Sequence, residues 1–284
     1  MKRFAIIGNP VAHSLSPDLH NWVFQRLSID AEYRRQPVTV NEIKDFVLRL
    51  RQGKLRGLNV TLPLKQLVTT ELDWLEFEAE KLGAVNCILW QDGKLKGYNT
   101  DIIGFRKTLM EAKINLAQRT CILLGAGGVA RSVLAAVMDA DPARIVIINR
   151  TPSHAYNLVN WAMAINNAIE ITTATLMEAE SVFTSDAVII NCTPVGMYPK
   201  VDTSPLPEHY LQQGQILIDT IYTPPLTRFL ALGKNRGAQV IGGLDMFIEQ
   251  ALASLDIWFD RRISDEVQRT ELKNYLIEIT NQRS

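Results

Sequence analysis

Residues 120–131 read T-C-I-L-L-G-A-G-G-V-A-R, which describes a short apolar strand, a glycine-rich turn and the start of a helix. In a dinucleotide-binding fold, this order brings backbone N–H groups and a helix N-terminus onto a pyrophosphate. Gly125 suits the tight turn, Gly127 lets the backbone approach the phosphates, and Ala130 allows the helix to pack closely on its strand. A flexible turn with the same spacing is the alternative. The candidate cofactor-binding residues here are Gly125, Ala126, Gly127, Gly128, Val129 and Ala130.

The strand after this turn ends at Asn149-Arg150-Thr151, about 20 residues further along the chain, where an NAD enzyme usually has an acidic residue for the ribose hydroxyls. That acid would repel a 2′-phosphate. Arg150 can instead bind such a phosphate through two hydrogen bonds and stack on adenine. The sequence therefore predicts NADP as the cofactor, with a solvated cation at a strand end as the alternative interpretation of Arg150.

More than a hundred residues precede the glycine-rich turn, so another structure is built ahead of it. A length of 284 residues corresponds to about two domains. We expect a Rossmann-type NADP-binding domain over residues 102–243. Residues 1–101, completed by residues 244–284, are expected to form a substrate-binding and catalytic domain.

Strand and helix patterns alternate in both parts of the chain. In the first part we expect strands at 4–7, 31–37, 57–61 and 87–90, helices at 17–27, 41–52 and from Pro63, and a hairpin turn at Asp92-Gly93. In the second part we expect strands at 121–124, 145–149, 187–191, 216–219 and 238–241, helices at 102–113 and 245–259, and a last helix capped by Ser264. This alternation predicts the α/β class, with a mostly parallel sheet covered by helices in each domain.

Composition excludes several classes of function. Lys+Arg and Asp+Glu number 30 each, which gives no electrostatic case for binding nucleic acid or an anionic membrane. No apolar run approaches the ~18 residues that cross a bilayer, and the first apolar stretch ends at Gly8, too early for a signal peptide. The three cysteines are widely spaced, so a reducing cytoplasm fits better than a disulfide framework. The four histidines are scattered and show no metal-ligand spacing.

Four polar segments of the first domain are expected where parallel strands end: H-S-L-S-P (13–17), N-V-T-L-P-L-K (59–65), A-V-N (84–86) and N-T-D (99–101). Ligands of open α/β sheets bind outside the carboxyl ends of the strands, so these segments are expected to converge. Each also has a structural alternative. Ser16-Pro17 and Thr100-Asp101 can cap helices, and the polar residues Ser14, Asn59, Thr61 and Asn86 can simply form turns.

Lys65 is harder to explain as a structural residue. If a helix opens at Pro63, Lys65 lies in its first turn, where the helix dipole disfavours a cation by roughly 0.3–1 kcal/mol. A surface lysine tolerates that cost. In a polar cleft, with Asp101 as its partner, Lys65 instead has the properties of a proton-transfer residue. Lys65 and Asp101 are therefore the candidate catalytic pair.

These motifs, taken together, resemble those of one family, the shikimate dehydrogenases, over nearly the whole chain and in the family's order. The matching segments are G-N-P-V-A-H-S-L-S-P, N-V-T-L-P-L-K, G-A-V-N, N-T-D, G-A-G-G-V-A-R, N-R-T, N-C-T-P-V-G-M (191–197), D-T-I-Y-T-P-P-L-T (219–227) and G-L-D-M-F-I-E-Q (243–250). Several independent motifs in one order are far more specific than a glycine-rich turn.

The resemblance implies reversible, NADPH-dependent reduction of a small molecule, 3-dehydroshikimate, to shikimate in chorismate and aromatic amino acid biosynthesis. It implies carboxylate binding by Ser14, Ser16, Thr61 and Tyr222, binding of ring hydroxyls by Asn59, Asn86, Asp101 and Gln250, and acid/base catalysis by Lys65. It also implies cofactor contacts from Asn149, Arg150, Thr151, His154, Thr220 and Gly243, the last two beside the nicotinamide.

The sequence departs from the family pattern at several positions. His154 stands where Arg or Lys is usual, which makes one phosphate contact weaker or pH-dependent, and Ile102 replaces a glycine after N-T-D. Cys87 and Cys192 replace other small residues. Two alternatives stay open: a quinate/shikimate dehydrogenase that uses NAD, and a non-catalytic NADP-binding regulator. The oligomeric state also stays open, with a homodimer as one option.

Overall fold

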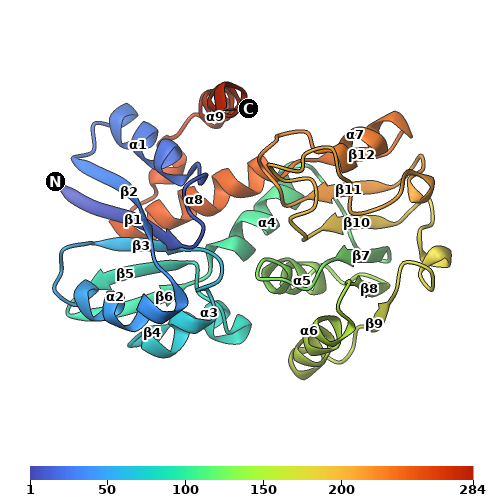
Figure 1. Cartoon of the computed structure of the whole chain (residues 1–284), viewed down its shortest axis with the longest axis horizontal. Coiled ribbons are helices and arrows are strands. Elements are labelled where there is room, and N and C mark those ends of the chain that lie inside the picture. Colours follow the sequence, from blue (N-terminus) through green and yellow to red (C-terminus); the bar gives the residue numbers. More distant parts are fainter. Residues whose placement is uncertain (284) are drawn as a thin grey trace. The chain divides into compact units, whose positions relative to one another are not determined.

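The computed structural model describes residues 1–283 and divides into two compact units (Figure 1). The first unit comprises Met1–Gly104 and the chain from Ile248 onward, and the second comprises Phe105–Phe247. Both boundaries fall inside helices, α4 (Thr100–Glu111) and α8 (Gly243–Phe259). Within residues 1–283 each unit contains one six-stranded sheet, and the predicted α/β class is confirmed.

The sheet of the first unit has the strand order β2-β1-β3-β5-β6-β4. Its strands are β1 (Lys2–Gly8), β2 (Ala31–Pro37), β3 (Gly57–Val60), β4 (Trp74–Leu75), β5 (Cys87–Gln91) and β6 (Lys94–Tyr98). β1 pairs in parallel with β2 and β3, whereas β5 runs antiparallel to both β3 and β6. The predicted hairpin turn joins β5 to β6, and Asp92 and Gly93 have φ angles of +52° and +74°, as such turns require.

Helices cover both faces of this sheet. One face packs against α2 (Ile43–Leu50), which buries a stripe of apolar side chains. On the other face Phe4 stacks on Trp258 of α8, with ring centroids 4.7 Å apart. Gly57 leaves room for this indole, since a Cβ there would lie 2.4 Å from Trp258 Nε1, and the same Nε1 donates to the Ile88 carbonyl at 2.9 Å. The other helices are α1 (Ser16–Arg26), α3 (Phe77–Leu82) and α9 (Arg269–Arg283), with 3-10 turns at Val40–Glu42, Leu67–Glu71 and Ile263–Glu266.

The sheet of the second unit is parallel, with the order β12-β11-β10-β7-β8-β9. Its strands are β7 (Thr120–Leu124), β8 (Arg144–Ile148), β9 (Ile171–Ala174), β10 (Val188–Asn191), β11 (Ile216–Asp219) and β12 (Gln239–Ile241). Its helices include α5 (Ala130–Met138), α6 (Pro152–Ile165) and α7 (Arg228–Asn235), with 3-10 turns at Glu180–Val182 and Glu208–Tyr210. The order of winding reverses between β7 and β10, which is where doubly wound sheets bind their ligands. The glycine-rich turn follows β7 at this point.

The predicted helix at Pro63 is wrong. Residues 62–66 form a turn, and only the 3-10 helix Leu67–Glu71 follows. In an α-helix the Lys65 carbonyl would accept the N–H four residues ahead, but here it accepts the N–H of Val85 at 2.8 Å. Buried Leu64 and Val68 imitate the apolar spacing of a helix. Lys65 therefore does not oppose a helix dipole, and the reason for its special role lies in its pairing with Asp101 instead.

One smaller expectation differs from the structure, and one strand was not expected. Ser264 does not cap the last helix, because its N–H and hydroxyl donate to Asp256 at 2.8 and 2.6 Å within a 3-10 turn, and α9 begins only at Arg269. The edge strand β9 was not predicted, since I-T-T-A is short and half polar. Within residues 1–283, no helix is long and apolar enough to cross a membrane.

Candidate functional site

Four chain segments meet at one edge of the first unit's sheet. The parallel strands β1 and β3 both end there. β5 runs antiparallel to β3, with Asn59 opposite Cys87, so Asn86 at the start of β5 lies beside the end of β3. Tyr98 of β6 is also opposite Cys87, which brings residues 99–101 to the same edge. The predicted segments 59–65, 84–86 and 99–101 are thus brought together. A-V-N precedes an antiparallel strand, however, instead of following a parallel one as expected.

Lys65 and Asp101 form an ion pair at this edge. Lys65 Nζ lies 2.6 Å from Asp101 Oδ2, and the two side chains are only 13% and 9% exposed. Asp101 stands in the first turn of α4, where the helix dipole favours a carboxylate. Asn86 Nδ2 donates to its other oxygen, Oδ1, at 2.8 Å. Both oxygens of the carboxylate are therefore hydrogen-bonded. The Lys65 ammonium group has three N–H donors, so it can also donate to an acceptor other than Asp101.

The side chain of Asn59 donates inside the protein. Its Nδ2 donates to the Asn86 carbonyl at 3.1 Å and to Ser254 Oγ at 3.0 Å. Because a backbone carbonyl can only accept, the first contact fixes which end of the carboxamide is the nitrogen. Asn59 Oδ1 accepts from the Tyr33 hydroxyl at 2.8 Å. Both amide protons are thus used inside the protein. Toward a bound molecule, Asn59 could act only as an acceptor, through Oδ1.

The side chain of Asn86 is oriented in the same way. Its Nδ2 donates to Thr100 Oγ1 at 3.0 Å as well as to Asp101, and its Oδ1 accepts the Thr100 N–H at 2.6 Å. Gln250 Oε1, from α8, lies 3.5 Å from the same Nδ2. The two asparagines and Asp101 therefore present acceptor atoms, and Lys65 supplies the cationic donor among them.

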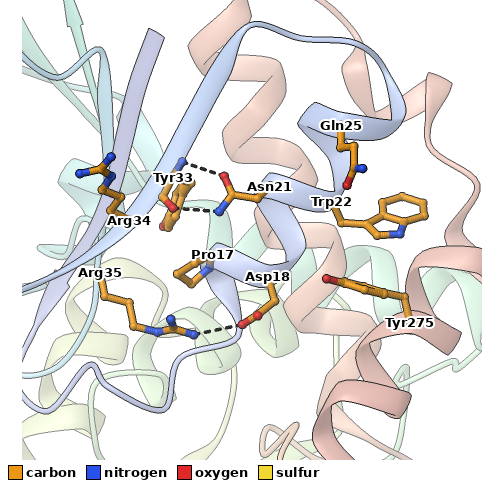
Figure 2. A pocket seen from close by; sticks show the side chains of 9 residues that line it. All are labelled: Pro17, Asp18, Asn21, Trp22, Gln25, Tyr33, Arg34, Arg35 and Tyr275. Atoms are coloured by element: carbon orange, nitrogen blue, oxygen red, sulfur yellow. Dashed lines mark hydrogen bonds and ion pairs between the residues drawn. The ribbon is translucent and has the colours of Figure 1, made fainter. Parts of the chain in front are cut away.

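Two hydroxyls stand at the start of α1. Ser14 Oγ donates to Ser16 Oγ at 3.1 Å and accepts the Ser16 N–H at 3.2 Å. The N-cap residue of α1 is Leu15, so Ser16 is not the cap that the structural alternative assumed. Arg35 holds this turn by donating to the Ser14 carbonyl at 2.6 Å and pairing with Asp18 at 3.0 Å (Figure 2).

The cavity in Figure 2 lies between α1, β2 and α9 and has a volume of about 400 Å³. Trp22 and Tyr275 form one wall, and Arg35 with Asp18 lies across from them. None of the predicted site residues in the described chain lines it. The cavity therefore lies next to the residues that hold the Ser14–Ser16 turn, but it is separate from the polar edge.

Thr61 lies in the turn after β3 and contacts the end of β1. Its N–H donates to the Ile7 carbonyl at 2.8 Å, and a Cβ on Gly8 would lie 2.4 Å from its methyl group. Tyr222 belongs to the second unit, where its ring stacks on that of Phe247 with ring centroids 4.2 Å apart.

The glycine-rich turn of the second unit contains two glycines with different surroundings. Gly125 has a φ of +102°, and a Cβ there would lie 2.7 Å from Thr193 Cγ2. Gly127 faces open space, with no neighbouring atom of the described chain within 4 Å of its would-be Cβ. Gly125 therefore shapes the turn against β10, while Gly127 leaves room for a ligand to reach the backbone. Gly128 and Val129 complete the turn, and buried Ala130 begins α5.

Polar side chains follow β8 beside this turn. Asn149 Oδ1 accepts the Ala126 N–H at 3.2 Å, and its Nδ2 donates to the Thr151 carbonyl at 2.8 Å. Thr151 is the N-cap of α6, and Arg150 and His154 are exposed on either side of it. A helix N-terminus flanked by an arginine and a histidine fits an anion such as a 2′-phosphate.

Thr220 and Gly243 also come together in the second unit. Thr220 Oγ1 donates to the Asn191 carbonyl at 2.9 Å, at the end of β10. A Cβ on Gly243 would lie 2.6 Å from the Thr220 carbonyl oxygen and 2.7 Å from that of Ile221. Only glycine allows this close approach of the two backbones.

Buried Asp219 organises the loops after β10 and β11. Its Oδ1 accepts from Asn191 Nδ2 at 3.1 Å and from the Ile221 N–H at 2.9 Å, and its Oδ2 accepts from the Thr227 hydroxyl at 2.7 Å. Burial raises the pKa of this carboxyl from 3.8 to about 6, although the three hydrogen bonds act to lower it. The segment that carries Thr220 thus depends on one largely buried carboxyl.

Three members of the polar network were not predicted as site residues. Thr100 belongs to the N-T-D motif but was considered only as a helix cap, a position that Asn99 takes by accepting the Ile102 N–H at 3.3 Å. Tyr33 and Ser254 lie in stretches that read as an ordinary strand and an ordinary buried helix. No local signal distinguishes them, because their partners are distant in the sequence. Within residues 1–283, no cluster of His, Cys, Asp or Glu could hold a metal ion.

Comparison with known proteins identifies the family of this chain. Residues 6–88 match the shikimate dehydrogenase substrate binding domain, and residues 108–200 match the shikimate / quinate 5-dehydrogenase family. A shikimate dehydrogenase (NADP(+)) of Clostridium beijerinckii is 36% identical over 267 residues, which cover 94% of this chain and 95% of the relative. The chain belongs to the shikimate dehydrogenase family. The resemblance inferred from its motifs is confirmed.

Solved structures of this family extend the comparison. The shikimate 5-dehydrogenase of Thermus thermophilus, in complex with NADP(H) and shikimate, has a TM-score of 0.84 at 31% identity, with 97% of this chain and 98% of that chain covered. A 5-ketofructose reductase of Gluconobacter has a TM-score of 0.82 at 27% identity, with 98% of each chain covered. The fold is therefore not confined to shikimate dehydrogenases, and the site must decide the substrate.

Asp219→Asn tests the buried carboxyl. In the wild type the folded state holds this proton more tightly than the unfolded chain, so its contribution to the free energy of unfolding falls as pH rises from about 4 to about 6. Asparagine can keep all three hydrogen bonds without a charge, with its Nδ2 donating to the Thr227 hydroxyl. We expect the variant to lose this part of the pH dependence and to equal or exceed the wild type above pH 6. Urea unfolding at several pH values measures it, and an unchanged pH profile would contradict it.

Proposed function

We propose that this protein catalyses the NADPH-dependent, reversible reduction of 3-dehydroshikimate to shikimate in chorismate and aromatic amino acid biosynthesis. The observation that carries the proposal is the largely buried Lys65–Asp101 pair beside a set of acceptor atoms. The family supports the same reaction, because its curated members are shikimate dehydrogenases that use NADP(+).

The first unit is proposed as the substrate-binding and catalytic domain. Ring hydroxyls of a polyhydroxylated substrate donate to acceptors, and Asp101, Asn59 and Asn86 offer these, with Gln250 beside them. A ketone oxygen can only accept, so it belongs at Lys65. The substrate carboxylate is assigned to the Ser14 and Ser16 hydroxyls at the start of α1, together with Thr61 and, from the second unit, Tyr222.

The second unit is proposed as the NADP-binding domain. The open backbone at Gly127 and the N-terminus of α5 suit a pyrophosphate. Arg150, Thr151 and His154 suit the 2′-phosphate that distinguishes NADP from NAD. The close pair Thr220 and Gly243 is assigned to the nicotinamide side. When bound, NADPH supplies the hydride that reduces the ketone.

Lys65 has two tasks in the proposed reaction. Negative charge develops on the ketone oxygen as it is reduced, and the Lys65 ammonium group stabilises that charge and then donates its proton. Asp101 keeps the ammonium group in place at 2.6 Å and accepts a neighbouring substrate hydroxyl. In the reverse direction the same pair removes the proton.

The cellular setting follows from the proposed reaction. We propose a cytoplasmic enzyme whose partners are its small-molecule substrate and cofactor, without nucleic acid or membrane. Light scattering of the purified protein tests the homodimer left open above.

Steady-state assays test the function directly. The oxidation of shikimate and of quinate is measured with NADP and with NAD. The reduction of 5-ketofructose by NADPH is the control for the wider fold. We expect the highest kcat/KM for shikimate with NADP. Dominant quinate/NAD activity would identify the alternative dehydrogenase, and a lack of turnover with NADP binding intact would identify the non-catalytic regulator.

Lys65→Ala tests the proton-transfer role. We expect kcat to fall on the order of 10²–10⁴-fold, the usual contribution of general acid–base catalysis, with KM for shikimate within several-fold. Lys96→Ala is the matched control, because Lys96 is a half-buried lysine of the same unit that donates to Gln91 at 3.0 Å. The control is expected to keep wild-type rates. Full activity of Lys65→Ala would refute the role.

The two glycines of the turn test the cofactor site. Gly127→Ala places a methyl group in open space, so we expect stability to change by less than about 1 kcal/mol but KM for NADP to rise about tenfold or more. Gly125→Ala meets Thr193 at a positive φ and is expected to cost about 1–3 kcal/mol of stability. Thermal unfolding and cofactor titration separate the two effects. Unchanged NADP binding in Gly127→Ala would rule out the assigned pyrophosphate site.

A further inference from the structure

Ser254, in the middle of α8, is fully buried and joins three other residues. Its hydroxyl donates to the Gln250 carbonyl one turn earlier at 3.0 Å. Its oxygen accepts from Asn59 Nδ2 at 3.0 Å and lies 3.2 Å from Thr100 Oγ1. Because the Ser254 proton goes to Gln250, the last contact forms when Thr100 turns its hydroxyl proton to Ser254 instead of to Asn86 Oδ1, which is also 3.2 Å away. One proton and both lone pairs of Ser254 are therefore used.

From Ser254 a continuous path of hydrogen bonds leads to Lys65. Thr100 accepts from Asn86 Nδ2 at 3.0 Å, and Asn86 Nδ2 also donates to Asp101 Oδ1 at 2.8 Å. Asp101 Oδ2 accepts from Lys65 Nζ at 2.6 Å. The path joins α8, α4, the start of β5 and the turn after β3. Each link is buried or half-buried, where hydrogen bonds hold their groups firmly.

A second path of hydrogen bonds leads from Ser254 through Asn59 of β3 to Tyr33 of β2. Asn59 Oδ1 accepts from the Tyr33 hydroxyl at 2.8 Å. The backbone of Tyr33 is in turn bracketed by the Asn21 carboxamide, with both contacts at 2.9 Å (Figure 2). His20 stacks on the Tyr33 ring with centroids 4.3 Å apart. Asn59 is thus held between a fixed tyrosine and Ser254.

We propose that Ser254 is a positioning residue, which fixes the orientation of Asn59 and, through Thr100 and Asn86, that of the Lys65–Asp101 pair. Only the expected effect on kcat rests on the proposed function; the effect on the side-chain orientations does not. Ser254 acts on the proposed reaction only through these other groups. Without its oxygen, an Asn59 amide proton loses its acceptor. The Thr100 hydroxyl, which lies 3.2 Å from both Ser254 Oγ and Asn86 Oδ1, then keeps only Asn86 as an acceptor.

Thr280 provides a matched control for a merely structural hydroxyl. It is also a buried helical residue of the first unit, 2% exposed, and its hydroxyl donates to the Leu276 carbonyl four residues earlier at 2.8 Å. Ser254 makes the same local bond, so the two residues share the helical contact. Ser254 has further links to Asn59, to Thr100 and to the thiol of Cys87. Effects seen at Ser254 but not at Thr280 therefore report those links.

The experiment compares Ser254→Ala, Ser254→Cys, Ser254→Thr and Thr280→Val. We expect alanine and cysteine at 254 to lower kcat for shikimate oxidation about tenfold, with KM changed less, because small displacements of a catalytic pair are costly. Threonine keeps the hydroxyl and is expected to restore kcat to within about threefold of the wild type. Thr280→Val is expected to leave kcat and KM unchanged. Cysteine separates hydrogen bonding from side-chain volume, since its thiol is a poor partner.

A spectroscopic measurement tests the same proposal without turnover. In protein labelled with 15N at asparagine, Ser254→Ala should shift the side-chain amide resonances of Asn59 and Asn86, whereas Thr280→Val should not. Wild-type kcat in Ser254→Ala, equal losses in Ser254→Ala and Thr280→Val, or unshifted asparagine amides would each overturn the proposal. If the wild type does not oxidise shikimate, the proposed function fails, and the amide resonances still decide the role of Ser254.

Discussion

The largely buried ion pair between Lys65 and Asp101 is the interaction on which the rest of the polar edge of the first unit depends. Two charged groups with 13% and 9% exposure have lost most of their water, and their attraction alone does not offset that loss unless further hydrogen bonds complete the site. Asn86 and the N-terminus of α4 complete it for the carboxylate. Asn86 is then itself a buried polar group that needs partners, and Thr100 supplies them. The network grows outward from the pair for this reason.

The strand order explains how so few residues build this network. If β5 were parallel to β3, its start would lie at the opposite edge of the sheet. Because it is antiparallel, Asn86, the residue just before β5, lies beside the end of β3, and the Val60 N–H donates to the Asn86 carbonyl at 2.8 Å. β6 then returns to the same edge and delivers Asp101. One reversal of direction in a mostly parallel sheet thus places two carboxamides and a carboxylate side by side.

The sequence predicted what depends on local pattern and missed what depends on distant partners. Apolar runs such as C-I-L-L gave the strands, and Asp92-Gly93 gave the hairpin, because these signals lie within a few residues. The helix at Pro63 failed because Val85, twenty residues from Lys65, takes the carbonyl that the helix would need. Ser264 failed likewise, since it bonds to Asp256 instead of to its own helix. The roles assigned by family resemblance, including that of His154, stay predictions.

The polarity of the site narrows the chemistry further than the fold does. Reductases of different keto compounds share this fold, as the similarity to a 5-ketofructose reductase illustrates. The amide protons of Asn59 and Asn86 are consumed inside the protein, so neither side chain can attract a carbonyl oxygen. In the proposed reaction the substrate hydroxyls act as donors and the carbonyl is left to Lys65, which would fix where reduction occurs on a polyhydroxylated ring. Under the same proposal the hydroxyls of Ser14 and Ser16, on a turn that Arg35 holds, are the groups that would select for a carboxylate, which a neutral keto sugar lacks.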